Sequence, residues 1–327
     1  MNKYIIFVLK ILRKMYMITF KVHKDKPKRE QDANKASNLI YNALMSDKPL
    51  MIARFGSTEL TCLMNYLGVK KGKKDIIGFI QGKTNPWWWQ PNLIIQMQTY
   101  SGFFPLEIDK IEKFCKLMLK DKNEVDILGS WLESENVIRN GMHDVKVDLL
   151  LLEPFWSDKP WTKALEDKKI LVVHPFSKTI VAQYEKRELL FDQKEVLPKF
   201  KSLTVIKAIQ SLGKGDDRFE DWFDALEHMQ DKIDKVDYDI CLIAAGAYGF
   251  SLAAHVKRKG KKAIHLGGAL QLLFGIRGRR WEVWDDKATQ FRTPKGFYTN
   301  LMNEYWIRPN EDEKPKLAKS VEGGCYW

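Results

Sequence analysis

The sequence contains few cysteines, and none of them has a neighbour at a spacing typical of a metal site or a redox motif. Its 327 residues include Cys62, Cys115, Cys241 and Cys325, and no Cys-x-x-Cys. This excludes zinc ribbons and thioredoxin-like motifs, and a disulfide scaffold is not expected in a chain of this length. We expect reduced thiols and a cytoplasmic location.

The sequence also lacks internal repeats, low-complexity tracts and a long uninterrupted apolar run. Its most apolar segment, Tyr4 to Phe20, is interrupted by Lys10, Arg13 and Lys14. A membrane-spanning helix needs about 20 mostly apolar residues, and a signal peptide needs an unbroken apolar stretch before a small-residue cleavage site. Neither pattern is present. Hydrophobic residues make up 45% of the chain and charged residues 29%, a globular composition that argues against disorder.

Positive charge is concentrated at the N-terminus. Residues 1–30 carry nine Lys or Arg and two acids, and therefore contribute +7 of the net charge of +12. Drawn as a helix, this segment has one basic stripe, and the remainder is apolar. Such a helix is expected to lie on an anionic membrane surface. The alternative is that it packs on the protein's own body or on a partner subunit. The stripe consists of Lys3, Lys10, Lys14 and Lys21, with Arg13 beside it.

The chain is expected to have three parts. Residues 1–32 form the basic helix and a charged linker that begins at Lys21, and the folded domain starts near Ala33. Residues 33–280 form the catalytic domain. Residues 281–327 form an aromatic extension that packs on this domain, because its large side chains need burial. These are Trp281, Trp284, Phe291, Phe297, Tyr298, Tyr305 and Trp306.

Short β-branched or aliphatic runs alternate with helical patterns through the body. Strands are predicted at residues 50–53, 125–128, 147–152, 169–173, 203–207, 238–244 and 262–265. Helices are predicted at residues 57–67, 131–139, 158–166, 177–187, 217–233, 249–259 and 270–274. This alternation indicates parallel strand pairing. The predicted fold is α/β and Rossmann-like, with a mostly parallel sheet, helices on both faces and an N-terminal amphipathic helix.

The first candidate site follows the strand at residues 50–53. Arg54 and Glu59 flank a turn that contains Gly56 and Ser57. Ligands of open parallel sheets bind beyond the carboxyl ends of the strands, where both charged side chains would lie. Arg54 suits a phosphate or a carboxylate, and Glu59 suits a general base or a metal ligand. The alternative is structural: Ser57 caps the helix, Glu59 favours its dipole, and Arg54 pairs with Glu59.

The second candidate site comprises two strand-to-helix corners rich in glycine. Glycine lets backbone N–H groups approach a ligand, and a helix N-terminus favours an anion. A diphosphate would fit there, and three arginines follow on what the pattern predicts to be a short loop. The alternative is a solvated basic loop and a core histidine. The predicted donor-binding residues are Gly246, Ala247, Tyr248 and Gly249 at one corner, His265, Gly267 and Gly268 at the other, and Arg277, Arg279 and Arg280.

Two further patterns admit a functional interpretation. Trp87, Trp88 and Trp89 lie between two prolines and could form a stacking platform for an acceptor sugar, although an aromatic plug that packs one lobe is the simpler interpretation. Three carboxylates at or after strand ends could face the cleft, and the sequence does not rank them. They are Asp126, Glu133 and Glu153.

The segment Arg54-Phe55-Gly56-Ser57-Thr58-Glu59 resembles the opening motif of bacterial GT-D-type glycosyltransferases, commonly Arg-Phe-Gly-Asp-Gly-Glu. Residues 243–268 resemble the same family. The resemblance implies a Rossmann-like fold and transfer of a sugar from a nucleoside diphosphate. In the family an Asp-x-Glu pair is tied to a divalent metal. Glu59 matches the glutamate, but Ser57 stands in place of the aspartate, so a need for Mn²⁺ or Mg²⁺ is open.

The expected function is therefore transfer of a sugar from a nucleotide-sugar donor, with a uridine nucleotide favoured, to a glycan acceptor. The acceptor is expected to be lipid-linked, and the enzyme to sit on the inner face of the cell membrane. Pyruvyl or phosphoryl transfer to a glycan is an alternative. A non-catalytic membrane scaffold or a nucleic-acid-binding protein is another. No nucleic-acid partner is expected, because the charge lies beside an apolar segment and no nucleic-acid-binding module is visible.

Overall fold

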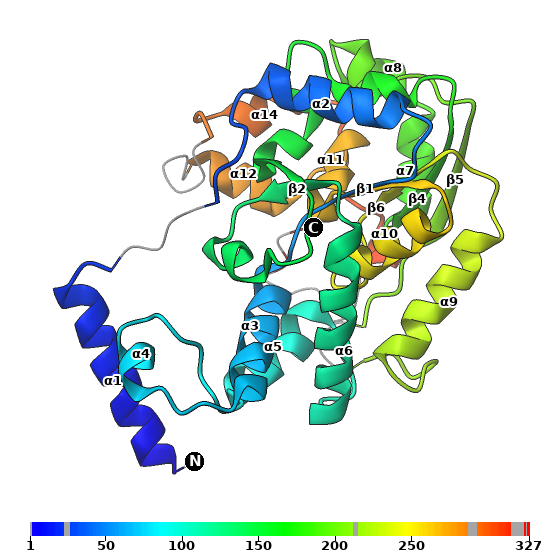
Figure 1. The fold of residues 1–327 in the computed structure, drawn as a ribbon. Coiled ribbons are helices and arrows are strands. Elements are labelled where there is room, and N and C mark those ends of the chain that lie inside the picture. The colour runs from blue at the N-terminus through cyan, green and yellow to red at the C-terminus, as the bar shows by residue number, and fades with distance from the viewer. Residues whose placement is uncertain (1, 23–26, 212–214, 287–292, 315–323, 325) are drawn as a thin grey trace.

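A computed structural model of the chain describes residues 2–22, 27–211, 215–286, 293–314, 324, 326 and 327. Its centre is a seven-stranded sheet in which every pair of neighbours is parallel, in the order β3-β2-β1-β7-β6-β4-β5 (Figure 1). The strands are β1 Leu50–Ala53, β2 Ile127–Ser130, β3 Val145–Asp148, β4 Lys169–His174, β5 Ser202–Lys207, β6 Ile240–Ile243 and β7 Lys262–His265. The α/β Rossmann-like fold predicted from the sequence is confirmed.

Helices surround the sheet and precede it. They are α1 Lys3–Thr19, α2 Ala33–Met45, α3 Ser57–Lys71, α4 Ile76–Ile80, α5 Pro91–Ser101, α6 Ile108–Asp121, α7 Ser177–Tyr184, α8 Arg187–Leu190, α9 Trp222–Asp234, α10 Tyr248–Arg258, α11 Leu270–Leu273, α12 Arg279–Asp286 and α14 Phe297–Leu301. Short 3₁₀ turns join several of them. These are η1 Lys122–Glu124, η2 Glu133–Ile138, η3 Leu149–Leu152, η4 Pro154–Trp156, η5 Trp161–Leu165, η6 Lys194–Val196, η7 Gly267–Ala269 and η8 Glu311–Glu313.

Several predicted elements differ from the observed ones. The strand predicted at 147–152 ends at Asp148, whose carboxylate accepts a hydrogen bond from the Leu150 amide and starts the turn η3. The helices predicted at 131–139 and 158–166 are the shorter 3₁₀ turns η2 and η5. The helix predicted from residue 217 begins at Trp222, because the Asp221 carboxylate caps the amides of Phe223 and Asp224.

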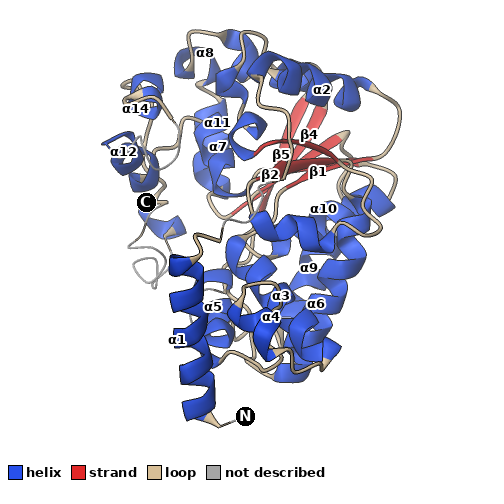
Figure 2. Cartoon of the chain, turned by 60° about the vertical axis from the view of Figure 1, so that its left-hand side comes forward, coloured by secondary structure: helices blue, strands red, loops and turns tan. Residues whose placement is uncertain are grey.

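The two faces of the sheet are both buried, as expected for parallel strands. Helices α3, α6, α9 and α10 cover one face, and α2, α7 and α11 cover the other (Figure 2). β1 is continued by α3 on the first face, whereas its neighbour β7 leads into α11 on the second. Adjacent strands whose connections leave on opposite faces create a crevice at their carboxyl ends, where ligands of this fold class bind.

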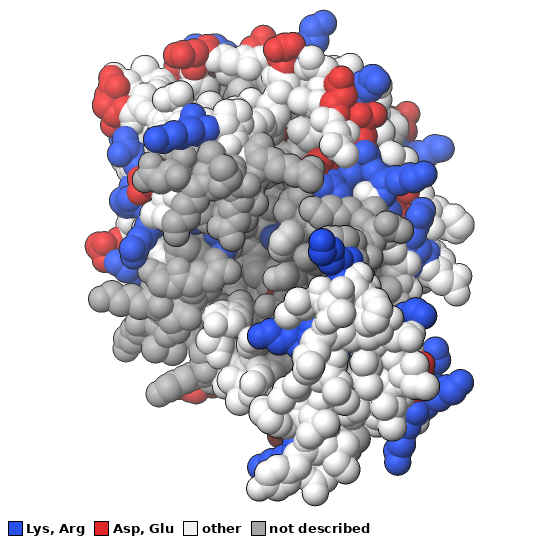
Figure 3. All heavy atoms as spheres, turned by 90° about the vertical axis from the view of Figure 1, so that its left-hand side faces the viewer, with Lys and Arg blue, Asp and Glu red and all other residues white. Residues whose placement is uncertain are grey.

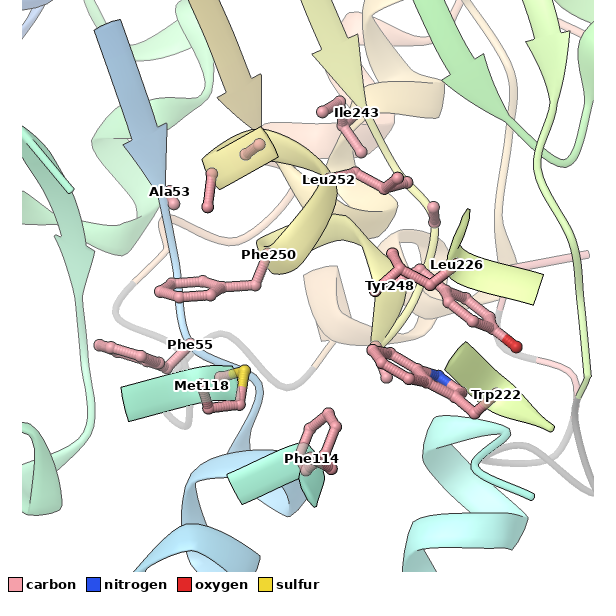
Figure 4. Packing of buried hydrophobic residues seen from close by; sticks show 14 of the residues in the cluster. Ala53, Phe55, Phe114, Met118, Trp222, Leu226, Ile243, Tyr248, Phe250 and Leu252 are labelled. Carbon is pink, nitrogen blue, oxygen red and sulfur yellow. The ribbon is translucent and has the colours of Figure 1, made fainter. Parts of the chain in front are cut away.

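Aromatic contacts fix the corners at this end of the sheet. Phe55, which follows β1, is fully buried and stacks on Phe250 of α10 with ring centroids 4.7 Å apart. Tyr248, at the start of α10, stacks on Trp222 of α9 at the same separation. Figure 4 shows both pairs within one cluster beneath the strand ends. The β1–α3 corner and the start of α10 are therefore held together by packing.

The N-terminal helix α1 docks on α4. Leu9 is buried against Phe79 and Trp88, and the Arg13 guanidinium donates to the carbonyls of Phe79 (2.8 Å) and Thr84 (3.1 Å). Arg13 therefore anchors the helix and does not extend the basic stripe. Nine large apolar side chains of α1 and its C-cap remain exposed, and Figure 3 shows them as a pale surface with Lys and Arg around it. They are Tyr4, Ile5, Phe7, Val8, Ile11, Leu12, Met15, Ile18 and Phe20.

No helix of the described residues combines the length and the apolarity that a transmembrane span requires. The predicted linker is partly docked on the body: the Glu30 backbone bridges to Val147 at the edge of the sheet, and Arg29 forms an ion pair with Asp148 at 2.8 Å. The Asp32 carboxylate caps α2, which starts at Ala33.

The aromatic C-terminal stretch packs on the face of the sheet that carries α2 and α7. Trp281, Tyr298 and Trp306 are buried in that core, and Phe297 stacks on Trp156 with ring centroids 3.6 Å apart. Tyr305 is partly exposed at 39%. The Trp284 side chain and Phe291 lie outside the described residues.

Candidate active site

A cleft of about 660 Å³ lies at the carboxyl edge of the sheet. Its wall includes residues that follow β1, β7, β6 and β4, so the two candidate sites of the sequence form one site. The predicted residues that line it are Arg54, Gly56, Ser57, Glu59, Gly246, Ala247, Tyr248, His265, Gly267, Gly268 and Arg280. Gly249, Arg277, Arg279 and the three consecutive tryptophans are not part of this lining.

Arg54 lies at the centre of the crevice between β1 and β7. Its guanidinium lies 5.4 Å from the centroid of the Trp131 ring and donates to the carbonyl of Phe55 at 3.1 Å. One of its terminal nitrogens would be only 3.0 Å from a Cβ at Gly267, whose φ is +65°, so glycine leaves room for the arginine there. The Phe55 carbonyl also accepts from the Trp131 indole at 3.0 Å, which fixes its position.

No salt bridge among the described residues neutralises the charge of Arg54. Its buried Nε has no hydrogen-bond partner, and within the described residues no carboxylate lies in ion-pair contact with it. Burial lowers the pKa of Arg54; Tyr326 and Glu59 act in the opposite direction, and Arg280 adds to the lowering. Arginine nevertheless stays protonated in proteins. A buried cation that has no direct ion pair is costly, so this corner of the cleft favours an anionic ligand.

Glu59 belongs to the first turn of α3 and folds back over Gly56. A Cβ at Gly56 would overlap the Glu59 carboxylate, so the glycine is required for this position of the side chain. The first turn of a helix stabilises a negative charge, as the structural alternative proposed. That alternative is wrong in its other two parts: the N-cap position is Gly56 without a side-chain cap, and Arg54 and Glu59 form no direct ion pair in the described structure.

The turn at Gly246, before α10, exposes its backbone to the cleft. Gly246 has φ of +52°, and a Cβ there would meet open space. Tyr248 is buried, and its hydroxyl forms a hydrogen bond of 2.6 Å with Ser211, so it supports the corner. Gly249 lies against the His265 ring, because its Cβ would come within 2.5 Å of two ring atoms. The N-terminus of the 11-residue helix α10 therefore opens into the cleft.

Two histidines line the cleft, and both are neutral. Burial lowers the pKa of His265 to about 3, with a further contribution from the Arg54 charge, and burial lowers the pKa of His174 to about 3 as well. The Nδ1 of His174 accepts the Phe176 amide at 3.0 Å, so its proton lies on Nε2. His174 therefore offers a neutral hydrogen-bond donor to the cleft, a role that the sequence did not indicate.

The arginines after the second glycine corner do not share one loop, as was predicted, because α12 begins at Arg279. Successive residues of a helix point about 100° apart. Arg280 lines the cleft and donates to the Tyr326 hydroxyl at 2.7 Å, whereas Arg279 is exposed. Arg277 donates to the Asn303 carbonyl at 2.9 Å and packs the C-terminal stretch.

Residues close to the C-terminus complete the wall, and no sequence signal pointed to them. Tyr326 and Trp327 line the cleft, and the Tyr326 ring lies where a Cβ of Gly268 would be. The Arg280 guanidinium is 4.7 Å from the centroid of that ring. Gly268 therefore admits the aromatic side chain that positions Arg280.

The structure ranks the three carboxylates that the sequence left open. Glu153 lines the cleft. Asp126 is structural: it accepts the Met51 amide and pairs with Lys257, both at 2.8 Å. Glu133 is exposed and outside the cleft lining.

The three consecutive tryptophans lie away from the cleft. Trp87 and Trp88 pack with Phe79 under α1, and Trp89 packs on Tyr66. This is the aromatic plug that the sequence offered as the alternative to an acceptor platform.

The cleft offers a divalent metal an incomplete set of ligands. Among the described residues, no three His, Cys, Asp or Glu side chains come together as a metal site would need. At the α3 corner the oxygen donors are the Glu59 carboxylate and the Ser57 hydroxyl. Mg²⁺ sites in enzymes of phosphorylated substrates often use one or two carboxylates together with substrate phosphates. Glu59 alone fits that pattern only with a bound diphosphate.

Comparison of the chain with protein-family models, with curated proteins and with solved structures finds no match.

Proposed function

We propose that this protein is a glycosyltransferase that uses a nucleoside-diphosphate sugar, with a uridine nucleotide favoured. The observation that carries the proposal is the Arg54 guanidinium, buried at the β1–β7 crevice without a counter-ion among the described residues. Arg280 lines the same cleft and adds a second positive charge. An anionic ligand would neutralise Arg54. The resemblance of residues 54–59 to the GT-D-type motif supports the diphosphate of a sugar donor as this anion.

The cleft supports a ligand of this size. Its volume of about 660 Å³ lies within the range of roughly 300–1,000 Å³ usual for small-molecule sites. Aliphatic and aromatic side chains form much of the wall and suit a base and a sugar ring, while polar groups lie at the strand ends. Among them are the neutral imidazole of His174 and the open backbone at Gly246.

In the proposed reaction an acceptor hydroxyl attacks the anomeric carbon of the donor, and the nucleoside diphosphate leaves. Negative charge grows on the leaving phosphate oxygen. Arg54, Arg280 and the N-terminus of α10 would stabilise this charge with groups that are already oriented before the reaction. Glu59 lines the same cleft and would orient the donor, or bind Mn²⁺ or Mg²⁺ together with its phosphates. The proposed mechanism needs no step on a metal.

The proposed acceptor is a lipid-linked glycan at the inner face of the cell membrane. The exposed apolar face of α1 and the lysines around it suit insertion into the interface of an anionic leaflet. Arg13 anchors α1 on the loop around α4, and Lys10 of α1 lines a groove of about 290 Å³ with Thr61 of α3. The helix that carries Glu59 therefore shares this groove with the helix that would contact lipid.

The test is the melting temperature of the chain in the presence of nucleoside diphosphates and nucleotide sugars, with and without Mn²⁺ or Mg²⁺. A ligand that binds the folded state alone at 100 times its dissociation constant stabilises it by about 2.7 kcal/mol. We expect a rise with one nucleotide class, larger for the sugar donor than for phosphate. A pyruvyl or phosphoryl donor that alone raises the melting temperature would contradict the proposal, as would no rise at all.

A further inference from the structure

Glu153 is a carboxylate that is nine-tenths buried and lines the cleft. It follows the turn η3 after β3, and its exposed fraction is 9%. One oxygen, Oε2, accepts hydrogen bonds from the Tyr298 hydroxyl (2.9 Å) and the Trp156 indole (3.3 Å). The other oxygen, Oε1, accepts no hydrogen bond from any described residue and is not sealed from solvent. The side chain is thus held at one oxygen and open at the other.

No described residue neutralises the charge of Glu153. Within the described residues it forms no ion pair, although the charged groups Arg280, Arg54 and Glu59 line other parts of the same cleft. The nearby elements contribute apolar walls, with Leu152 from η3 and Trp281 from α12. Burial raises the pKa of Glu153 to about 7, and the hydrogen bonds from Tyr298 and Trp156 only partly oppose this rise.

These features are those of a general base. A base must present a free oxygen to the proton that it abstracts, and it works best when its pKa is close to the working pH. A carboxylate in an apolar pocket meets both needs. Glu59, in the first turn of α3, is the other carboxylate of this cleft, and its place at a helix N-terminus suits a role in donor binding.

We propose that Glu153 is the catalytic base of the transfer reaction, an inference that rests on the proposed glycosyltransferase function. Oε1 takes the proton of the acceptor hydroxyl while the acceptor oxygen forms a bond to the anomeric carbon. The bond between that carbon and the phosphate oxygen breaks, and its electron pair leaves with the nucleoside diphosphate. Tyr298 and Trp156 are positioning residues that hold Oε2, so that Oε1 faces the acceptor.

The experiment compares Glu153→Gln with the matched control Glu133→Gln, an exposed glutamate outside the cleft. The first readout is the rise in melting temperature with UDP-glucose, UDP-galactose and UDP-N-acetylglucosamine. The second is UDP release from the bound donor with water as the acceptor, measured from pH 5 to 9. We expect Glu153→Gln to keep the rise in melting temperature and to lose about 10²- to 10⁴-fold in rate, the usual contribution of a general base.

The wild-type rate should increase through about pH 7, and Tyr298→Phe should move this increase to higher pH, because the hydrogen bond from Tyr298 lowers the pKa of Glu153. Glu153→Gln with a rate within threefold of the wild type and an intact rise in melting temperature would overturn the role of Glu153 alone. No rise for the wild type, or no UDP release from a bound donor, would instead overturn the proposed function. Should Glu153→Gln fail to fold, an unmoved pH profile of Tyr298→Phe would overturn the role.

Discussion

Replacement of Glu153 by glutamine should make the folded chain more stable at high pH and leave its stability unchanged at low pH. Burial raises the pKa of this carboxyl from its ordinary value of 4.5 to about 7. A carboxyl whose pKa is raised by folding is harder to ionise in the folded state than in the unfolded state. Below about pH 4 it is protonated in both states and has no effect. As the pH rises from about 4.5 to about 7, this carboxyl ionises more readily in the unfolded state, so the free energy of unfolding decreases progressively.

The magnitude follows from the same values. One pKa unit corresponds to about 1.4 kcal/mol, so the ionised Glu153 lowers the free energy of unfolding by about 3 kcal/mol above pH 8. Glutamine has nearly the same shape, and its amide oxygen can still accept from Tyr298 and Trp156. The variant avoids the cost of the buried charge. For a chain of this length, about 3 kcal/mol corresponds to a rise in melting temperature of roughly 5 °C.

The assay is thermal unfolding of the wild type, Glu153→Gln and Glu133→Gln at about pH 4, 6 and 8.5. The difference between Glu153→Gln and the wild type should grow with pH, while the exposed control should stay within about 0.5 kcal/mol throughout. If Glu153→Gln were as stable as the wild type at every pH, or less stable than the wild type at high pH, Glu153 would not be a buried carboxylate whose charge lacks compensation. A gain in stability with a loss of turnover would mark Glu153 as a residue kept for function.

Two other predictions concern packing and the membrane. Gly249→Ala should destabilise the chain by about 1–3 kcal/mol, because the added Cβ would lie 2.5 Å from the buried His265 ring. The variant should also lose the donor-induced rise in melting temperature. Denaturant unfolding that is unchanged from the wild type would contradict this contact. Phe7→Asp with Ile11→Asp should reduce sedimentation with phosphatidylglycerol vesicles and leave the melting temperature unchanged, since both side chains are exposed in α1. The control Val137→Asp, at another exposed apolar site, should bind these vesicles like the wild type, and equal binding by all three chains would exclude α1 as the lipid contact.

The sheet was predictable because its strands are short apolar runs that alternate with helical patterns. β1 and β7 were predicted at their observed residues, and the first strand-to-helix corner was found at Arg54 and Gly56. Strand order was not predictable, since it depends on which faces the helices cover. Helices α2, α4, α5 and α6 were missed, and glycines and prolines around the three tryptophans interrupt the helical pattern of the stretch that contains α4 and α5.

Within the site, the sequence predicted the strand-to-helix turns at the ends of the strands. It did not predict the side chains that reach the cleft only through tertiary packing. The sequence does not distinguish Arg277, Arg279 and Arg280 from one another. Their side chains point in different directions because α12 begins at Arg279. Tyr326 comes to the cleft from the last residues of the chain, and no local pattern indicates that placement. Glu153 could be noted as a carboxylate after a strand, but its value as a base depends on burial and on Tyr298, which is 145 positions away in the sequence.

Arg54 and Arg280 are the proposed ligands of the donor diphosphate, and substitution of two consecutive arginines of α12 tests this assignment. Arg280→Met removes a cleft-lining charge, whereas Arg279→Met removes an exposed charge from the preceding residue. The measurement is the dissociation constant of UDP by calorimetric titration. Loss of one hydrogen bond to a charged group costs about 1.5–3 kcal/mol, so Arg280→Met should weaken binding about 10- to 100-fold and Arg279→Met should leave it unchanged. Equal affinity for UDP in both variants and the wild type would show that Arg280 does not hold the diphosphate.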